Sequence, residues 1–109
     1  MRSWARPTEV EPGSGIAQQL TLMEELVRED ITGPDFARAW YSARNSSLRA
    51  GERIREPFYR ILNEVFYALE DYAIDPTLYE EGDTTDEELV ACVRDALAKL
   101  RALERQHSE

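Results

Sequence analysis

The carboxylates of this chain are the side chains whose number and spacing could do chemistry. The stretch EDYAIDPTLYEEGDTTDEEL, residues 70–89, holds nine of them and no Lys, Arg or His. From Ile61 to Val93 there are ten acids and no base, and because the whole chain carries −9, everything outside this segment sums to +1. Clustered carboxylates can bind a cation, transfer protons or attract a cationic partner.

Calcium binding is the most specific of these possibilities. An EF-hand loop needs acids at positions one, three and five and a glycine at position six. With Asp75 first, positions three and five are Thr77 and Tyr79; with Gly82 sixth, position one is Thr77. Neither register fits the pattern, so we expect no metal, and a non-standard cation site stays open as an alternative.

Enzymatic chemistry lacks its usual groups in this sequence. The single histidine, His107, lies in a polar tail, and the single cysteine, Cys92, follows Val90 and Ala91, which favours a buried, inert thiol. The chain has no glycine-rich phosphate loop and no cluster of Cys or His with metal-ligand spacing. The acids are expected in water, on a loop and a helix start, which does not favour acid–base catalysis. We expect no enzymatic activity and no cofactor.

The charge also limits the partners. A segment of −10 repels nucleic-acid phosphates and anionic membrane surfaces, so the sequence predicts no direct nucleic-acid binding and no membrane binding. No run approaches the ~18 apolar residues of a membrane span, and the N-terminal stretch MRSWARPTEVEPGSG has no apolar signal segment. One cysteine excludes an internal disulfide framework and fits a cytoplasmic location.

Four amphipathic helices are expected to position the acids, because apolar residues recur at three- and four-residue spacing in four segments. The predicted inward residues are Ile16, Leu20, Met23, Leu26, Val27 and Ile31; Phe36, Trp40 and Ala43, with Leu48 as a further candidate; Phe58, Ile61, Leu62, Val65, Phe66, Leu69 and Tyr72; and Leu89, Val93, Ala96, Leu97, Leu100 and Leu103. No segment alternates with period two. The sequence therefore predicts an all-α fold, an antiparallel four-helix bundle.

Capping residues set the expected helix boundaries. Ser14 can cap the first helix, Gly33 or Thr32 the second, and Thr85 with Glu88 forms a capping box for the fourth.

The domain is expected to span residues 14–105. Residues 1–13 read as a flexible lead-in and residues 106–109 as a C-terminal tail. Trp4 could instead dock on the domain, but a loose terminus is the preferred interpretation.

Two structural roles could explain acids without any partner. Helix initiation accounts for Asp86, Glu87 and Glu88, which favour the positive end of a helix dipole. Six arginines between Arg38 and Arg60 could fold back on other acids, although surface ion pairs stabilise by only ~0–1 kcal/mol each. Helix initiation leaves seven acids without a structural reason, namely Glu64, Glu70, Asp71, Asp75, Glu80, Glu81 and Asp83.

Tyrosines lie among these acids. Glu64 and Asp71 are seven residues apart on one helical stripe with Tyr67 between them, and Tyr72 and Tyr79 follow. Acids steer a basic partner toward the surface, and tyrosine is a frequent interface anchor. The pattern favours a surface that binds a cationic protein.

The stretches DITGPDFARAWYSAR and FYRILNEVFYALEDYAIDPTLYEEGDTTDEELVACVRDALAKL resemble the bacterial self-protective immunity proteins of the colicin D type. The similarity rests on the order of ALEDY, a DP loop, an acidic run, DEEL and VRDALAKL, and it spans roughly residues 16–103. The resemblance implies a small acidic helical bundle that binds the nuclease domain of a toxin made by the same cell. In the colicin D case that toxin cuts tRNA in a positively charged active site, which the immunity protein's carboxylates would cover in place of RNA phosphates.

The leading hypothesis is an immunity protein that binds a cognate basic nuclease toxin domain and is a monomer before the complex forms. The arginine-rich stretch 44–60 does not fit this hypothesis, because it would repel a cationic cleft if it lay on the same face. The alternatives are a regulatory adaptor for an unrelated basic protein and a small cation-binding or structural bundle. The expected contact residues are Glu64, Tyr67, Asp71, Tyr72, Asp75, Tyr79, Glu80, Glu81, Asp83, Asp86 and Glu87.

Overall fold

The computed structural model describes residues 2–106, and most of them are helical. The elements in chain order are β1 (Arg2–Trp4), a 3₁₀ helix (Pro7–Glu9), α1 (Gly15–Val27), α2 (Gly33–Arg49), β2 (Glu52–Ile54), α3 (Phe58–Glu70), a 3₁₀ helix (Pro76–Leu78) and α4 (Asp86–Gln106). The four predicted helices are therefore present. A small two-stranded sheet, which the sequence did not predict, is present in addition, so the fold is mostly helical. The antiparallel order of the bundle stays a prediction.

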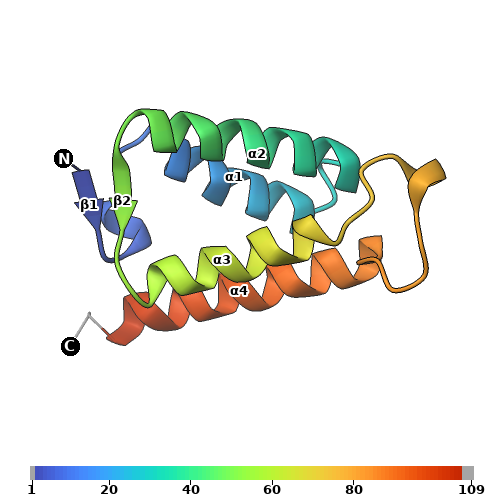
Figure 1. The fold of residues 1–109 in the computed structure, drawn as a ribbon. Coiled ribbons are helices and arrows are strands. Elements are labelled where there is room, and N and C mark those ends of the chain that lie inside the picture. Colours follow the sequence, from blue (N-terminus) through green and yellow to red (C-terminus); the bar gives the residue numbers. More distant parts are fainter. Residues whose placement is uncertain (1, 107–109) are drawn as a thin grey trace.

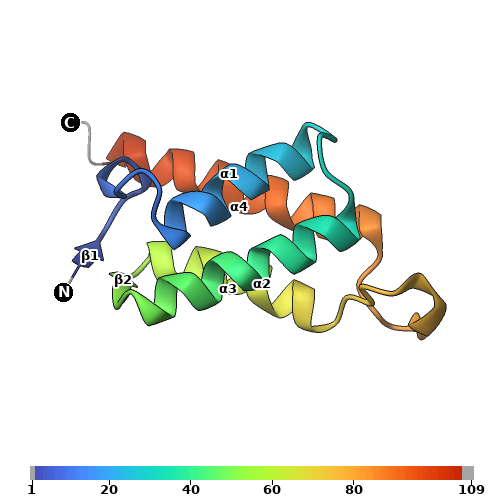
Figure 2. The same cartoon turned by 90° about the horizontal axis from the view of Figure 1, so that it is seen from above.

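The helices form two layers. Figure 1 shows α1 and α2 as one layer and α3 and α4 as the other, with α1 also packed on α4. The two short strands lie at one end of the molecule, and the connection between α3 and α4 extends beyond the helices at the opposite end (Figure 2). The longest dimension of the molecule is 45 Å.

The core largely follows the predicted apolar stripes. All six predicted inward residues of α4 are buried, as are five of the seven predicted for α3; Phe66 and Tyr72 are partly buried. Leu48 is 59% exposed, so its assignment to the core is wrong. The spacing of Phe36, Trp40 and Ala43 places Ser47 inward instead, where it is buried.

Ser47 is inward because the helices approach closely at that point. A Cβ on Gly15, at the start of α1, would lie 2.5 Å from the carbonyl oxygen of Ala43 and 2.7 Å from the Cβ of Ser47. Only a glycine on α1 and a small residue on α2 allow this contact.

The predicted flexible lead-in is wrong for the part of it that the structure describes. β1 pairs in parallel with β2, with Ser3 opposite Arg53 and Trp4 opposite Ile54, and the amide of Arg55 donates to the carbonyl of Trp4 at 2.9 Å. Trp4 is only 8% exposed and belongs to the core. Docking of this large aromatic side chain supplies the burial that orders the segment. Met1 and the tail residues 107–109, with His107, lie outside the described residues.

The helix starts use both local and distant caps. Ser14 Oγ accepts from the amide of Ala17 at 3.1 Å, and Thr32 rather than Gly33 caps α2. At α1 a second, unpredicted acceptor is present: the buried carboxylate of Glu52 accepts from the amides of Gly15 (3.2 Å) and Ile16 (3.1 Å). β2 thereby satisfies helix donors that would otherwise be unpaired.

Candidate functional site: the acidic tip

Residues 70–88, here called the acidic tip, comprise the last residue of α3, the following loop and the first turn of α4. Nine carboxylates lie in this segment. At its start, Tyr41 of α2 donates a hydrogen bond to Glu70 Oε2 at 3.1 Å. Burial, followed by this hydrogen bond, raises the pKa of Tyr41 to about 12. This hydrogen bond ties the end of α3, where the acidic tip begins, to α2.

A narrow neck joins the two ends of the loop. Tyr72 and Thr84 form an isolated parallel bridge, and the amide of Thr84 donates to the carbonyl of Asp71 at 2.8 Å. The Tyr72 hydroxyl donates to Asp86 at the start of α4, and both groups pack against Gly33, where any side chain would collide with them. Burial, and next the hydrogen bond to Asp86, raise the pKa of Tyr72 well above its ordinary value. Tyr72, predicted as a contact residue, thus closes the neck.

Local hydrogen bonds also shape the loop. Asp75 caps the 3₁₀ turn Pro76–Leu78 by accepting from the amide (3.0 Å) and hydroxyl (2.8 Å) of Thr77. The hydrogen bond from the Thr77 amide, and next the one from its hydroxyl, lower the pKa of Asp75. Asp83 Oδ2 accepts from the amide of Glu80 at 2.9 Å. These two acids are therefore partly committed to holding the loop conformation.

The fourth helix starts as predicted. Thr85 Oγ1 accepts from the amide of Glu88 at 3.1 Å, and Glu88 Oε1 accepts from the amide of Thr85 at 3.0 Å. This reciprocal capping box confirms one structural role for an acid of the tip. It leaves Glu87, in the same helical turn, exposed and without such a bond within residues 2–106.

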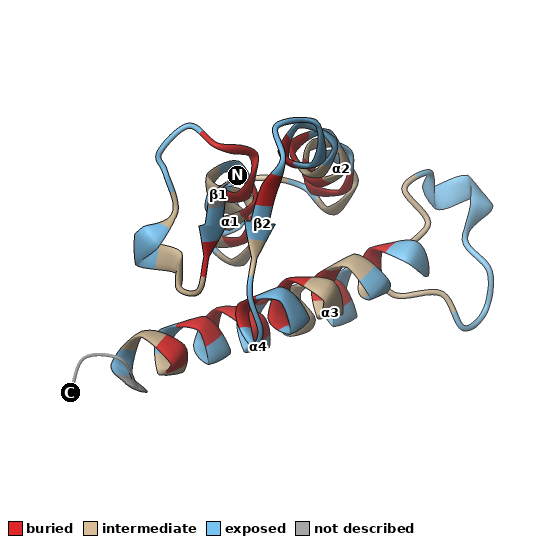
Figure 3. Ribbon diagram, turned by 60° about the vertical axis from the view of Figure 1, so that its left-hand side comes forward, coloured by how far each residue is buried: buried red, intermediate tan, exposed pale blue. Residues whose placement is uncertain are grey.

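The carboxylates of the tip face water. No residue of the acidic tip is buried (Figure 3). The exposed acids are Glu70, Asp71, Asp75, Glu80, Glu81, Asp86, Glu87 and Glu88, and Asp83 is partly exposed.

The described chain offers these acids no basic partner. Within residues 2–106, none of them lies within 4.0 Å of a lysine or arginine nitrogen. The arginines do not fold back into ion pairs with this segment: Arg38 pairs with Asp35 (3.2 Å) and Arg60 with Glu56 (3.3 Å). At longer range the charge of Arg38 contributes to the lowered pKa of Asp75. Within residues 2–106, no ion pair neutralises the acids of the tip.

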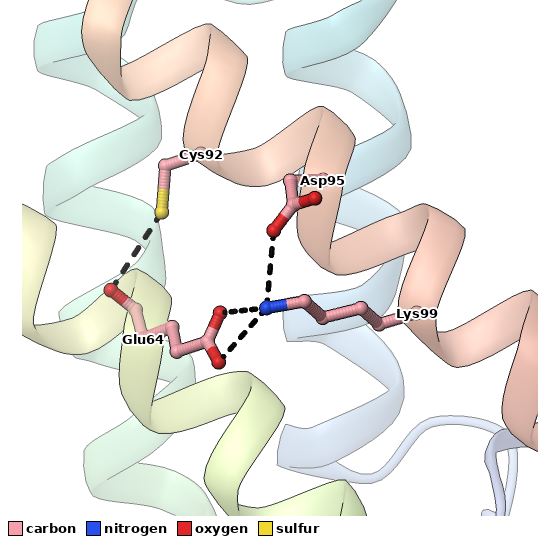
Figure 4. A network of polar contacts seen from close by, with 4 residues as sticks. All are labelled: Glu64, Cys92, Asp95 and Lys99. Atoms are coloured by element: carbon pink, nitrogen blue, oxygen red, sulfur yellow. Dashed lines mark hydrogen bonds and ion pairs between the residues drawn. The ribbon is translucent and has the colours of Figure 1, made fainter.

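Glu64, also predicted as a contact residue, lies in a different environment. Figure 4 shows its carboxylate facing Lys99 of α4, whose Nζ lies 3.1 and 2.9 Å from the two oxygens and also pairs with Asp95 at 3.1 Å. The Cys92 thiol donates to the carbonyl of Glu64 at 3.7 Å. Burial, with the nearby charges of Glu64 and Asp95, raises the pKa of Cys92, so a reactive thiolate is disfavoured.

Apolar side chains are exposed on and beside the tip. Tyr79 is 49% exposed on the loop, and Tyr67 is 63% exposed on α3. Leu78, which the sequence interpretation missed, is 69% exposed beside Tyr79. The signal in the sequence was a leucine in a polar loop, at a position that belongs to no apolar stripe of a helix. Large exposed apolar groups of this kind mark interaction sites when they cluster.

In residues 2–106 there is no group of three or more His, Cys, Asp or Glu side chains placed to hold a metal ion. No helix in the same part of the chain has the length and apolarity to cross a membrane.

Comparison of the sequence with known protein families identifies one match. A model of bacterial self-protective colicin-like immunity proteins matches residues 15–100, from the start of α1 to the penultimate turns of α4. No curated protein and no solved structure matches the chain. Because the match covers most of the sequence, the chain belongs to the bacterial self-protective colicin-like immunity family.

Proposed function

We propose that this immunity protein inhibits a nuclease toxin, with a tRNase as the expected kind, by covering a basic active site with its acidic tip. Family membership indicates immunity against a bacterial toxin, and proteins of this family act as inhibitors rather than as enzymes. The observation that carries the proposal is the set of exposed carboxylates without a basic partner in residues 2–106. A nuclease cleft that binds phosphates offers the complementary charge.

The tip is suited to this task because hydrogen bonds restrain it. The neck through Tyr72 and the hydrogen bonds of Asp75 and Asp83 limit the conformations open to the loop. A preordered loop loses less conformational entropy on binding than a flexible acidic tail would. The carboxylates of Glu80 and Glu81 are then presented together on a fixed support.

Affinity also needs apolar anchors. Acids at an interface mainly raise the association rate, whereas a few desolvated side chains carry most of the binding energy. Leu78 and Tyr79 lie between Asp75 and Glu80, so a partner that accepts the acids also meets these two side chains. We propose Leu78 and Tyr79 as anchors, Tyr67 as a peripheral contact, and the exposed acids as phosphate mimics.

The partner and location follow from the same proposal. The cognate partner is the basic C-terminal domain of a toxin made by the same cell, bound by a monomer in the cytoplasm. Its gene is expected beside the gene for this chain. A neighbouring region with no gene for a protein ending in a basic domain would favour the adaptor alternative.

The experiment compares charge reversals at two exposed acids. Glu81→Lys changes an acid of the tip, and Glu56→Lys changes an acid between β2 and α3 that pairs with Arg60. We expect Glu81→Lys to slow association with the toxin domain by roughly tenfold at low salt. Glu56→Lys should change the rate by less than about twofold. Glu81→Lys should melt like the native protein, whereas Glu56→Lys loses its exposed pair with Arg60, which is worth only ~0–1 kcal/mol.

Salt is the second arm of this experiment. The native association rate should fall as ionic strength rises, because exposed charges are screened beyond ~8–10 Å at physiological salt. Equal effects of Glu81→Lys and Glu56→Lys, together with a rate that is flat in salt, would show that the acids of the tip do not guide binding.

A further inference from the structure

The arginine-rich stretch 44–60 is a feature of the sequence that the acidic tip does not explain. Arg49 and Arg53 are exposed, and within residues 2–106 neither lies within 4.0 Å of a carboxylate oxygen. Glu52, the acid between them, is buried, and its two oxygens accept from the first amides of α1. In the described chain, no ion pair neutralises these two arginines.

Exposed apolar side chains accompany the arginines. Leu48 is 59% exposed at the end of α2, and Tyr59 is 49% exposed at the start of α3. Together with Arg53, they line a pocket of about 330 Å³ between α2 and α3, which Leu62 and Phe66 also line. We call this pocket and its rim the α2–α3 face. Large exposed apolar groups that cluster around a hollow mark interaction sites.

An aromatic cluster joins this pocket to the acidic tip. Tyr41 of α2 packs edge-on against Phe66 of α3, with ring centres 6.2 Å apart, and the Arg44 guanidinium lies 4.2 Å from the centre of the same ring. The Tyr41 hydroxyl donates to Glu70, the first residue of the tip. The α2–α3 face and the acidic tip are therefore neighbouring parts of one surface.

A single partner domain can cover both parts. Tyr59 and Glu70 lie at opposite ends of α3, which has 13 residues and is therefore ~20 Å long. A standard protein interface covers about 800 Å² on each partner, which corresponds to a patch roughly 30 Å across. A toxin domain bound at the tip can thus reach the α2–α3 face as well.

The chemistry of this face limits what it accepts. The pocket offers apolar surface to an apolar side chain, and the charges lie on its rim. Arg49 and Arg53 would repel a basic surface there, whereas acidic side chains would meet two guanidinium groups that have no ion pair in the described chain. Arginine and aromatic side chains also contribute much of the binding energy of protein interfaces.

We propose that the α2–α3 face is a second contact surface for the cognate toxin, which places an apolar side chain between Leu48 and Tyr59 and acidic side chains beside Arg49 and Arg53. The inference rests on the proposed function, in which the same toxin domain binds the acidic tip. The tip covers the basic active site, and the α2–α3 face contacts a part of the toxin outside it. This contact gives the arginine-rich stretch a role.

The first test is the sign of a charge reversal. The probe is the basic C-terminal domain encoded by the neighbouring toxin gene, titrated with the full chain. Arg53→Glu should weaken binding by about fivefold, because it places a carboxylate opposite acids of the toxin. Arg94→Glu, an exposed position on α4 outside the pocket, adds the same charge and should change the affinity by less than about twofold. Simple attraction of a basic toxin predicts tighter binding by both variants, so Arg53→Glu binding as tightly as the native chain, or more tightly, would overturn the inference.

The second test removes the apolar contact. Leu48→Gln combined with Tyr59→Gln should leave the chain folded, because both side chains are exposed and glutamine suits a helix. Dissociation of the toxin domain should be about tenfold faster, by the same factor at low and high salt, because apolar contacts are not screened. An unchanged dissociation rate would contradict the inference. If the double variant does not fold, Arg53→Glu alone decides.

Glu81→Lys separates this inference from the proposed role of the tip. If Glu81→Lys slows association while the α2–α3 variants bind normally, this inference alone fails. If the α2–α3 variants weaken binding while Glu81→Lys does not, the role of the tip fails and the α2–α3 contact stands. Sedimentation of the free chain tests another occupant. A concentration-dependent dimer that the Leu48→Gln and Tyr59→Gln changes abolish would assign the face to a second copy and overturn the inference.

Discussion

The two ends of this molecule use charged side chains in opposite ways. At the acidic tip, carboxylates such as Glu80 and Glu81 extend into water and meet no lysine or arginine of the described chain. Around β2, two charged side chains are engaged by the fold itself: Glu52 accepts from the first amides of α1, and Arg55 donates to the hydroxyl of Ser3 at 3.2 Å. The comparison separates charge that serves folding from charge that is left for a partner.

Apolar side chains follow the same division. Phe58, at the β2 end, is fully buried in the core, whereas Leu78, on the tip, is 69% exposed. The side chain of Phe58 should therefore be needed for stability, and that of Leu78 should not.

The largest expected effect comes from a pair of truncations. Phe58→Ala removes a buried ring and should lower the free energy of unfolding by about 3–5 kcal/mol. Leu78→Ala removes an exposed side chain and should change it by less than about 0.5 kcal/mol. Urea denaturation of both variants measures the difference. Similar losses in the two variants would mean that the tip is packed on the bundle and is not a free surface.

The fold was predictable where the signals are local. Helical spacing and a capping residue occur within a few positions of each other, so four helices and the caps at Ser14 and Thr85 could be read from the sequence. The β1–β2 pairing could not, since strands of three residues show no alternation and their partners are about fifty residues apart. The capping role of Glu52 was not predicted for the same reason, because its amide partners lie 36 and 37 residues away.

The candidate site shows the same limit. Composition alone located the acidic segment, and the described structure leaves most of its acids exposed. Composition could not assign individual roles, which depend on contacts across the fold. Tyr72 reaches Asp86 on the next helix, and Glu64 meets Lys99, 35 residues further on.

A medium effect is expected at the neck of the tip. Tyr72→Phe removes the hydrogen bond to Asp86 and should lower the free energy of unfolding by about 1 kcal/mol. The loop amides should also exchange hydrogen faster, because the neck then opens more readily. Hydrogen exchange measured by mass spectrometry, with Tyr59→Phe as a control at an exposed tyrosine, tests this effect.

The pH dependence of this variant has a definite sign. The folded pKa of Tyr72 is raised, so its contribution is fully present below the ordinary tyrosine pKa of about 10 and is lost as pH rises above that value. The stability advantage of the native protein over Tyr72→Phe should therefore be constant from pH 7 to about 9 and decline above about 10. Tyr41 is present in both proteins, so its own raised pKa cancels in the difference. An advantage that persists unchanged at high pH would contradict the role of the hydroxyl.

The smallest expected effects come from neutralising single acids, Glu64 and Glu81. Glu64 is paired with Lys99, while Glu81 has no basic partner in the described chain. Glu64→Gln should change the free energy of unfolding by only ~0–1 kcal/mol, as is usual for exposed pairs, and should hardly alter toxin affinity. Glu81→Gln should leave stability unchanged but weaken toxin binding by about two- to fivefold, and less so at high salt. Titration calorimetry at two ionic strengths compares them directly. If Glu64→Gln weakens binding as much as Glu81→Gln, then Lys99 must release Glu64 in the complex, and the binding surface must extend from the tip along α3.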